Sequence, residues 1–199
     1  MFFRKKRPET VPLRPGERAP DFQLPSVQGG LFRLEMRAAH GPVLLAFVNV
    51  GEESRELLER LKEHEGGFRR AGAYNYPYPN PEIREGGVPS TRSGTTVAIV
   101  VRAASMGPVR ELQKSMGLPF YVLWDDRSMV STRYGVGETE IPVVLVETDG
   151  KLAWRSEPDQ LPHPEEMLRE IRPAPGTVNP AAETHETPSP EAAVDSSVG

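Results

Sequence analysis

The sequence contains no cysteine at all. The chain therefore forms no disulfide, offers no thiolate to a metal ion and carries out no reaction that depends on a thiol. Long apolar runs are missing as well, because no stretch reaches the roughly 18 residues that a membrane-spanning helix needs. We accordingly expect no transmembrane segment.

A strong excess of one charge is also lacking. The 199 residues carry a net charge of −4, which favours neither nucleic acid nor a membrane surface, so we expect no nucleic-acid partner. A short basic cluster at residues 4–7 follows two phenylalanines, but no apolar segment of the secretory type comes after it. The default expectation without such a signal is a cytoplasmic protein.

Motifs for several kinds of chemistry are absent. The sequence has no phosphate-binding loop, no zinc-type spacing, no H-E-x-x-H and no G-x-S-x-G. Gly135-Val136-Gly137 is a lone G-x-G that does not open a helix, so we interpret it as a turn. We predict no metal site and no bound cofactor.

What the sequence does contain is an alternation of buried strands and amphipathic helices. Apolar runs predict strands at residues 43–50, 95–101 and 120–124; helical spacing predicts helices at about 54–70, 108–116, 129–134 and 164–171; and Asp149-Gly150 predicts a hairpin of residues 143–147 and 151–155. This order indicates an α/β protein, a three-layer α/β/α sandwich with a mixed central sheet.

A single domain is predicted between irregular ends. We expect a flexible basic arm at residues 1–12, a domain at 13–172 with a Pro- and Gly-rich insertion loop at 74–94, and a disordered acidic, Pro-rich tail at 173–199. The tail has almost no large apolar side chain, so burial cannot offset the entropy of ordering it.

The centre of the predicted domain is a strand that feeds a helix through Gly51-Glu52-Glu53-Ser54. Such a turn lies at the carboxyl end of a sheet, where open α/β folds place their chemistry.

Several segments around this turn resemble the redoxin branch of the thioredoxin-like superfamily, which includes peroxiredoxins of the alkyl hydroperoxide reductase/thiol-specific antioxidant type. The similar segments, in family order, are Pro15-Gly16-Glu17-Arg18-Ala19-Pro20-Asp21-Phe22-Gln23-Leu24, Val43–Phe47, Leu118-Pro119-Phe120, Leu123-Trp124-Asp125, Tyr134-Gly135-Val136, Ile141-Pro142 and Asp149-Gly150-Lys151. The resemblance implies a thioredoxin-like fold, thiol oxidoreductase or peroxidase activity, and a cis-proline at Ile141-Pro142 that exposes backbone to an extended peptide.

The chain departs from that family at the reactive centre. The alignment puts Gly51 and Ser54 at the two cysteine positions, with Glu52 and Glu53 between them. Carboxylates at a helix start stabilise the helix but raise the pKa of a nearby thiol. The family's thiol reaction cannot be assigned to these positions, and we predict no catalytic residue there.

Two other chemistries are conceivable at this turn, serine catalysis and binding of a divalent cation. Ser54 as a nucleophile needs a base within hydrogen-bond reach, yet His40 is predicted at the opposite end of the sheet and His64 roughly 15 Å along the helix, so a helix N-cap or a solvated hydroxyl is favoured. Glu52 and Glu53, with Glu138 and Glu140 facing the same edge, would attract a divalent cation, but nothing fixes a ligand geometry.

The insertion loop offers a second candidate surface. Tyr74, Tyr76 and Tyr78 alternate with asparagine and proline, which favours polyproline II and rigid aromatic contacts. A partner-binding loop, a packed insertion and a disordered loop all fit this pattern.

The leading hypothesis is a redoxin-like domain that has lost thiol catalysis and acts as a binding or scaffold module, with a protein or extended peptide bound at residues 51–54, Ile141-Pro142 and the Tyr/Pro loop. The alternatives are a family oxidoreductase or antioxidant that relies on a cofactor or a partner's thiol, and a structural subunit whose arm and tail tether other proteins.

Overall fold

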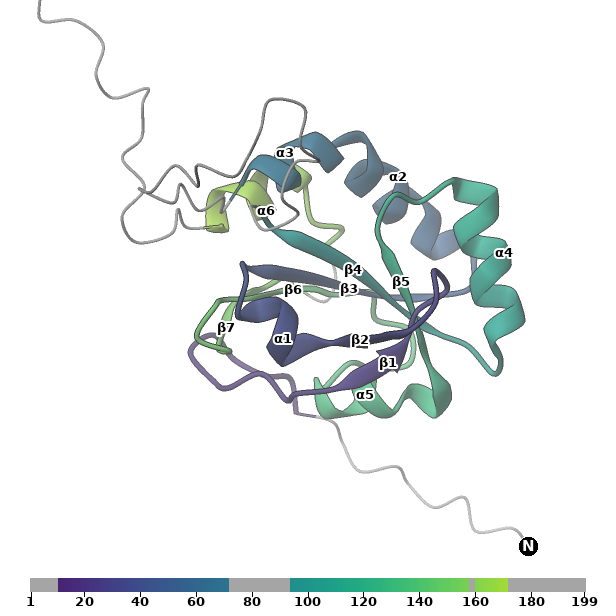
Figure 1. Cartoon of the computed structure of the whole chain (residues 1–199), viewed down its shortest axis with the longest axis horizontal. Coiled ribbons are helices and arrows are strands. Elements are labelled where there is room, and N and C mark those ends of the chain that lie inside the picture. Colours follow the sequence, from purple (N-terminus) through teal and green to yellow (C-terminus); the bar gives the residue numbers. More distant parts are fainter. Residues whose placement is uncertain (1–10, 72–93, 158–159, 172–199) are drawn as a thin grey trace, which may run out of the picture.

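The structure is a computed structural model that describes residues 11–71, 94–157 and 160–171 (Figure 1). Nearly all of the predicted basic arm and insertion loop, with Tyr74, Tyr76 and Tyr78, lies outside the described residues, as does the whole predicted tail. Among the residues that the structure describes, no helix combines the length and the apolar character that crossing a membrane requires.

A five-stranded mixed sheet forms the middle layer. Its strands, in spatial order, are β5 (Tyr121–Asp125), β4 (Thr96–Arg102), β3 (Val43–Asn49), β6 (Val143–Val146) and β7 (Leu152–Arg155). The first three run parallel, whereas β6 and β7 are antiparallel to their neighbours. A separate antiparallel hairpin is made by β1 (Gln23–Pro25) and β2 (Leu31–Arg33).

Helices cover both faces of this sheet, so the predicted three-layer α/β sandwich is confirmed (Figure 1). One face packs against α2 (Arg55–Glu63), α3 (Glu65–Arg70), α4 (Met106–Met116) and α6 (Pro164–Glu170). The other face packs against the β1–β2 hairpin, α1 (Leu34–Ala38) and α5 (Met129–Arg133).

The central strand explains why two cores form. Residues 43–48 of β3 are all fully buried, and alternate side chains point to opposite faces. Leu44, Ala46 and Val48 belong to the core under α2 and α4, whereas Leu45 and Phe47 belong to the core under the hairpin. An uninterrupted apolar run is what a strand covered on both faces requires.

The predicted helix at about 54–70 is in fact two helices that meet at His64. Gly66 and Gly67 lower the helix propensity there. Gly67 also allows a close approach of α6, since a Cβ atom at this position would lie 3.1 Å from Leu168 Cδ1. The short helix α1 was not predicted.

The described residues on either side of the insertion are tied together. Thr95 Oγ1 donates a hydrogen bond to the Ala71 carbonyl at 2.9 Å, and the Thr95 N–H donates to Phe68 O at 3.0 Å. The chain therefore leaves α3 and returns to the start of β4 at one place in the fold.

Candidate functional site

The carboxyl ends of the parallel strands form one edge of the sheet, which we call the rim. It consists of Asn49 at the end of β3, the turn 51–54, Arg102 at the end of β4, Asp125 at the end of β5 and the loop 134–142. The end of β3, just before the turn, contacts the loop, because Asn49 Nδ2 donates to the Glu138 carbonyl at 3.2 Å. The turn and the Ile141-Pro142 segment thus lie on chain segments that meet at this edge of the sheet.

Ser54 ties the end of β3 to the start of α2. Its side chain is fully buried, and its hydroxyl oxygen accepts the Asn49 N–H at 3.1 Å. Ser54 stands at the N-cap position of α2, as predicted, but its side chain makes no capping hydrogen bond, and the alternative of a solvated hydroxyl is wrong. Ser54 is the last residue of the 3-10 turn Glu52–Ser54, and this turn places its hydroxyl against the Asn49 N–H at the end of β3.

The two glutamates of the turn are exposed, as expected, but they do different things. Glu52 forms an ion pair with Arg55 of α2, with 2.8 Å between Oε1 and Nε. The Glu53 carboxylate lies over Gly51: a Cβ atom at position 51 would be 2.6 Å from Glu53 Oε1. The space next to Gly51, where the family resemblance places a thiol, is therefore filled by a carboxylate.

Arg102 is a buried cation beneath the rim. It is 8% exposed, and its two terminal nitrogens donate to the carbonyls of Gly137, at 2.5 Å, and Glu140. Its Nε atom has no hydrogen-bond partner among the residues that the structure describes. Burial lowers the pKa of the Arg102 guanidinium, and the nearby carboxylates of Asp125 and Glu140 act in the opposite direction.

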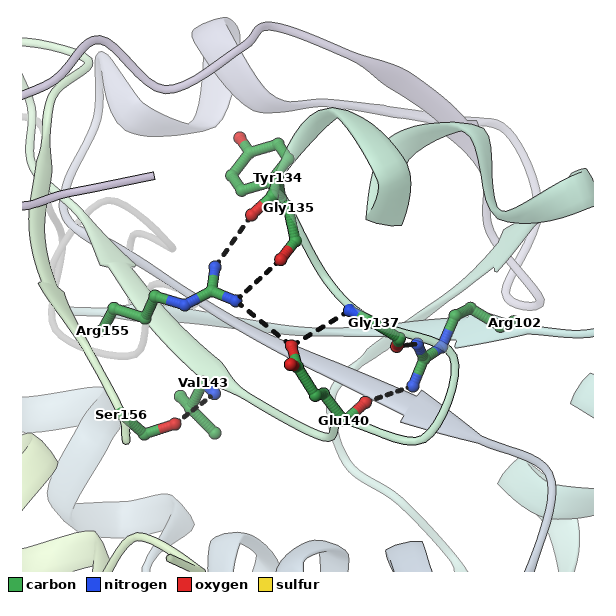
Figure 2. A network of polar contacts seen from close by, with 8 residues as sticks. All are labelled: Arg102, Tyr134, Gly135, Gly137, Glu140, Val143, Arg155 and Ser156. Atoms are coloured by element: carbon green, nitrogen blue, oxygen red, sulfur yellow. Dashed lines mark hydrogen bonds and ion pairs between the residues drawn. The ribbon is translucent and has the colours of Figure 1, made fainter. Parts of the chain in front are cut away.

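Arg155 of β7 holds the first part of the same loop (Figure 2). Its side chain is 8% exposed and donates to the carbonyls of Tyr134, at 2.8 Å, and Gly135, at 3.3 Å. Glu140 Oε2 lies 3.7 Å from Arg155 Nη2 and also accepts the Gly137 N–H at 3.0 Å. Burial lowers the pKa of Arg155, and Glu140 opposes that shift.

Asp125 fixes the start of α5. It is fully buried, and its carboxylate accepts three hydrogen bonds, from the Val130 N–H at 2.9 Å, the Ser131 N–H at 2.8 Å and the Ser131 hydroxyl at 2.6 Å. These bonds satisfy helix donors that would otherwise be unpaired. The carboxylate is thus used structurally.

The peptide bond between Ile141 and Pro142 is trans, because no cis peptide bond occurs among the described residues. The predicted cis-proline is therefore wrong. The Pro142 carbonyl accepts the Phe47 N–H at 3.0 Å and so extends the β3–β6 pairing by one step. An ordinary trans peptide lets the chain run straight into β6.

The backbone of Ile141, unlike that of Pro142, takes no part in strand pairing. Within the described part of the chain, neither its N–H nor its carbonyl has a backbone partner, and the residue is half-buried. An extended segment next to a sheet with unpaired main-chain groups is a place where another extended strand can add.

The described residues at which the insertion is attached lie at the opposite end of β4 from the rim. The insertion departs from Ala71 and returns at Gly94, before the start of β4, whereas the rim lies after its end. A seven-residue strand spans about 23 Å. The tyrosines of the insertion thus remain a separate prediction.

Metal binding at the rim finds no support in the structure. In the ranges 11–71, 94–157 and 160–171, no group of three or more His, Asp or Glu side chains is arranged to hold a metal ion. The rim glutamates Glu52 and Glu140 instead face arginines.

The two buried arginines were missed at the level of sequence. Arg102 ends an apolar run, which is a weak signal, and Arg155 looks like any charged residue of a hairpin. The carbonyls that Arg102 contacts are 35 and 38 positions away, and those that Arg155 contacts are 20 and 21 positions away, so the residue types do not reveal these contacts.

Comparison with known folds gives a consistent class. Solved structures similar to this chain include the peroxidoxin BcpB from Mycobacterium tuberculosis (TM-score 0.59, 16% identity, 80% of this chain and 96% of that chain), a secreted disulfide oxidoreductase from Mycobacterium tuberculosis (0.54, 16%, 75% and 93%) and the thioredoxin domain of a thiol-disulfide oxidoreductase from Bacteroides vulgatus (0.53, 12%, 80% and 99%). No protein-family model matches the chain, and no curated protein matches it.

These likenesses define the fold. The chain has the thioredoxin-like fold of thiol-disulfide oxidoreductases and peroxiredoxin-like proteins, and it carries that fold without any cysteine. At such low identity the activity of the similar proteins does not transfer with the fold.

Proposed function

We propose that this chain is a non-catalytic binding module that presents its rim to an extended protein segment. The observation that carries this proposal is the backbone of Ile141, which has no backbone hydrogen-bond partner among the described residues and belongs to the loop that Asn49 ties to the end of β3. Addition of an extended segment to such an edge uses main-chain hydrogen bonds and requires no thiol.

The described residues offer no base to a serine nucleophile at the turn. The Ser54 hydroxyl is buried and engaged by Asn49. Of the histidines in the described residues, His64 contacts the Arg60 carbonyl, and His40 and His163 are exposed on other elements. A serine without a base within hydrogen-bond reach is a poor nucleophile.

Exposed side chains of the rim suggest the character of the ligand. Val50, 44% exposed, gives an apolar contact just after β3, and Glu52, whose side chain is 86% exposed, gives a carboxylate that a basic ligand side chain would share with Arg55. A segment with alternating apolar and basic side chains complements both, because every second side chain of an extended strand faces the same way.

The test uses the full chain and peptides selected against it from a random display library. We expect Val50→Arg to weaken a selected peptide by about tenfold or more, because it places a large charge in the contact. The matched control is Met36→Arg on α1, an exposed apolar residue outside the rim. Equal weakening by both substitutions, or failure to select any peptide, contradicts the proposal.

A turnover assay separates this proposal from an oxidoreductase. We expect the purified chain to consume a hydroperoxide in the presence of a dithiol no faster than buffer does. Consumption above that rate would favour an activity that uses a cofactor or a partner's thiol.

A further inference from the structure

We propose that Arg102, Arg155 and Glu140 act as one unit, the arginine clamp, that positions the Ile141 edge for its ligand. The inference rests on the proposed function of that edge, and all three are positioning residues. Figure 2 shows the unit, with guanidinium groups from β4 and β7 converging on the loop between them.

The loop 134–140 belongs to no helix or strand, and within the described residues its backbone hydrogen bonds are confined to N–H groups that bond back to the end of α5 and to one turn from Gly137 to Glu140. Four of its carbonyls are instead held by guanidinium groups: those of Tyr134 and Gly135 by Arg155, and those of Gly137 and Glu140 by Arg102. The last of these precedes Ile141 directly. The Ile141 backbone is thus held on one side by Arg102, through the Glu140 carbonyl, and on the other by the pairing of Pro142 with Phe47 of β3.

Glu140 joins the two halves of the clamp. Its carboxylate faces Arg155 at 3.7 Å and accepts the Gly137 N–H at 3.0 Å, while its own carbonyl accepts from Arg102. Because the three contacts converge on one residue, a change at Glu140 reaches both arginines.

Stability alone does not account for this arrangement. Two buried cations are costly, and well-packed apolar side chains stabilise a fold as well as a buried ion pair does. What apolar groups cannot do is satisfy loop carbonyls, and lysine lacks the planar fork that holds two of them at once. The identity of the arginines therefore points to control of the loop's shape.

The first experiment measures amide hydrogen exchange in the full chain for Glu140→Gln, Arg155→Lys and Arg102→Lys, with the exposed Arg110→Lys of α4 as the matched control. We expect the hydrogen-bonded amides of Gly135, Val136, Gly137 and Glu140 to exchange about tenfold faster in the three clamp variants, while those of β3 and β4 stay within about twofold. Unchanged exchange in the loop of both Glu140→Gln and Arg155→Lys would overturn the clamp, as would an equal increase throughout the chain.

The second experiment measures binding of a peptide selected from the random display library on the wild-type chain. We expect Glu140→Gln and Arg155→Lys to weaken it by about tenfold and Arg110→Lys to leave it unchanged. Faster loop exchange with unchanged binding would overturn the positioning role. If no peptide can be selected, the proposed function fails, and the positioning role fails with it; the exchange measurement then still decides whether the clamp exists.

Discussion

Gly51 and Ser54 stand where the resemblance places two cysteines, and their surroundings disfavour a thiol in different ways. Glu53 covers the first position with a negative charge, and the second is buried against the end of β3. The two carboxylates and the absence of a thiol can be read directly from the sequence. It did not predict that Ser54 would be buried, because that depends on how the 3-10 turn folds back.

Restoring the thiols tests this description of the turn. In the double variant G51C/S54C, the thiol introduced at position 51 meets the Glu53 carboxylate, so its pKa should be raised and its alkylation by iodoacetamide slow near neutral pH. Adding Glu53→Gln should speed alkylation by about threefold to tenfold. The control is Glu56→Gln on α2, and identical rates with Glu53→Gln and Glu56→Gln would show that the carboxylate is not over the thiol position.

Tyr134 gives a prediction for alkaline pH. Burial raises its pKa well above the ordinary value of 10.0, and its hydroxyl donates to the Pro20 carbonyl at 2.9 Å. A group with a raised pKa in the folded state contributes stability that is complete below its unfolded pKa and is lost as the pH rises toward the folded value. The wild-type chain should thus lose stability above pH 10.0, and Tyr134→Phe should lose less.

The measurement is urea unfolding at a series of alkaline pH values, with absorbance at a phenolate wavelength as a second readout. Near neutral pH Tyr134→Phe should be less stable by about 1 kcal/mol, because the hydrogen bond is gone. The control is Tyr121→Phe on β5, which removes the hydroxyl of a half-buried tyrosine elsewhere in the fold. Parallel pH profiles for wild type and Tyr134→Phe would contradict the account.

At the scale of elements, periodicity predicted every strand of the central sheet and most helices, because β3 and β4 are buried on both faces and therefore read as continuous apolar runs. The five-residue helix α1 was missed because it is too short for a helical repeat to be visible. The break at His64 was only hinted at by the two glycines that follow, since it depends on contact with α6.

The link between β5 and α5 depends on Asp125. Replacing it with asparagine puts an amide against the donors of Val130 and Ser131 and takes away a carboxylate near Arg102. We expect Asp125→Asn to lower the free energy of unfolding by about 2–4 kcal/mol. Asp126→Asn, at the exposed neighbouring position, should change it by less than about 0.5 kcal/mol, and comparable effects in urea unfolding would refute the buried role.

The attachment of the insertion predicts that it can be removed. Because Thr95 is hydrogen-bonded to Ala71 and Phe68, a short Gly-Ser linker in place of residues 72–93 should close without strain. The change in the free energy of unfolding should stay within about 1 kcal/mol. Thr95→Val serves as the control that breaks the tie, and a collapse of stability in the linker variant alone would show that the domain depends on the insertion.

At the scale of the whole molecule, the fold class and the sheet edge that carries the site were both predictable, whereas the inner construction of the rim was not. The order of strands and helices determines where the strand ends meet, and that order is visible in the pattern of apolar residues. Arg102 and Arg155 contact backbone carbonyls, so the identities of the loop residues do not predict the clamp. The trans peptide before Pro142 accompanies the pairing of Pro142 with Phe47, which the sequence does not reveal either.

The central claim is that the rim binds an extended segment and performs no thiol chemistry. The most direct measurement is an amide chemical-shift map of the 15N-labelled full chain titrated with a peptide selected on it. The largest shifts should fall on residues 49–54 and on residues 137–142, the segment that contains Ile141. Shifts concentrated elsewhere on the fold, with the rim unmoved, would contradict it.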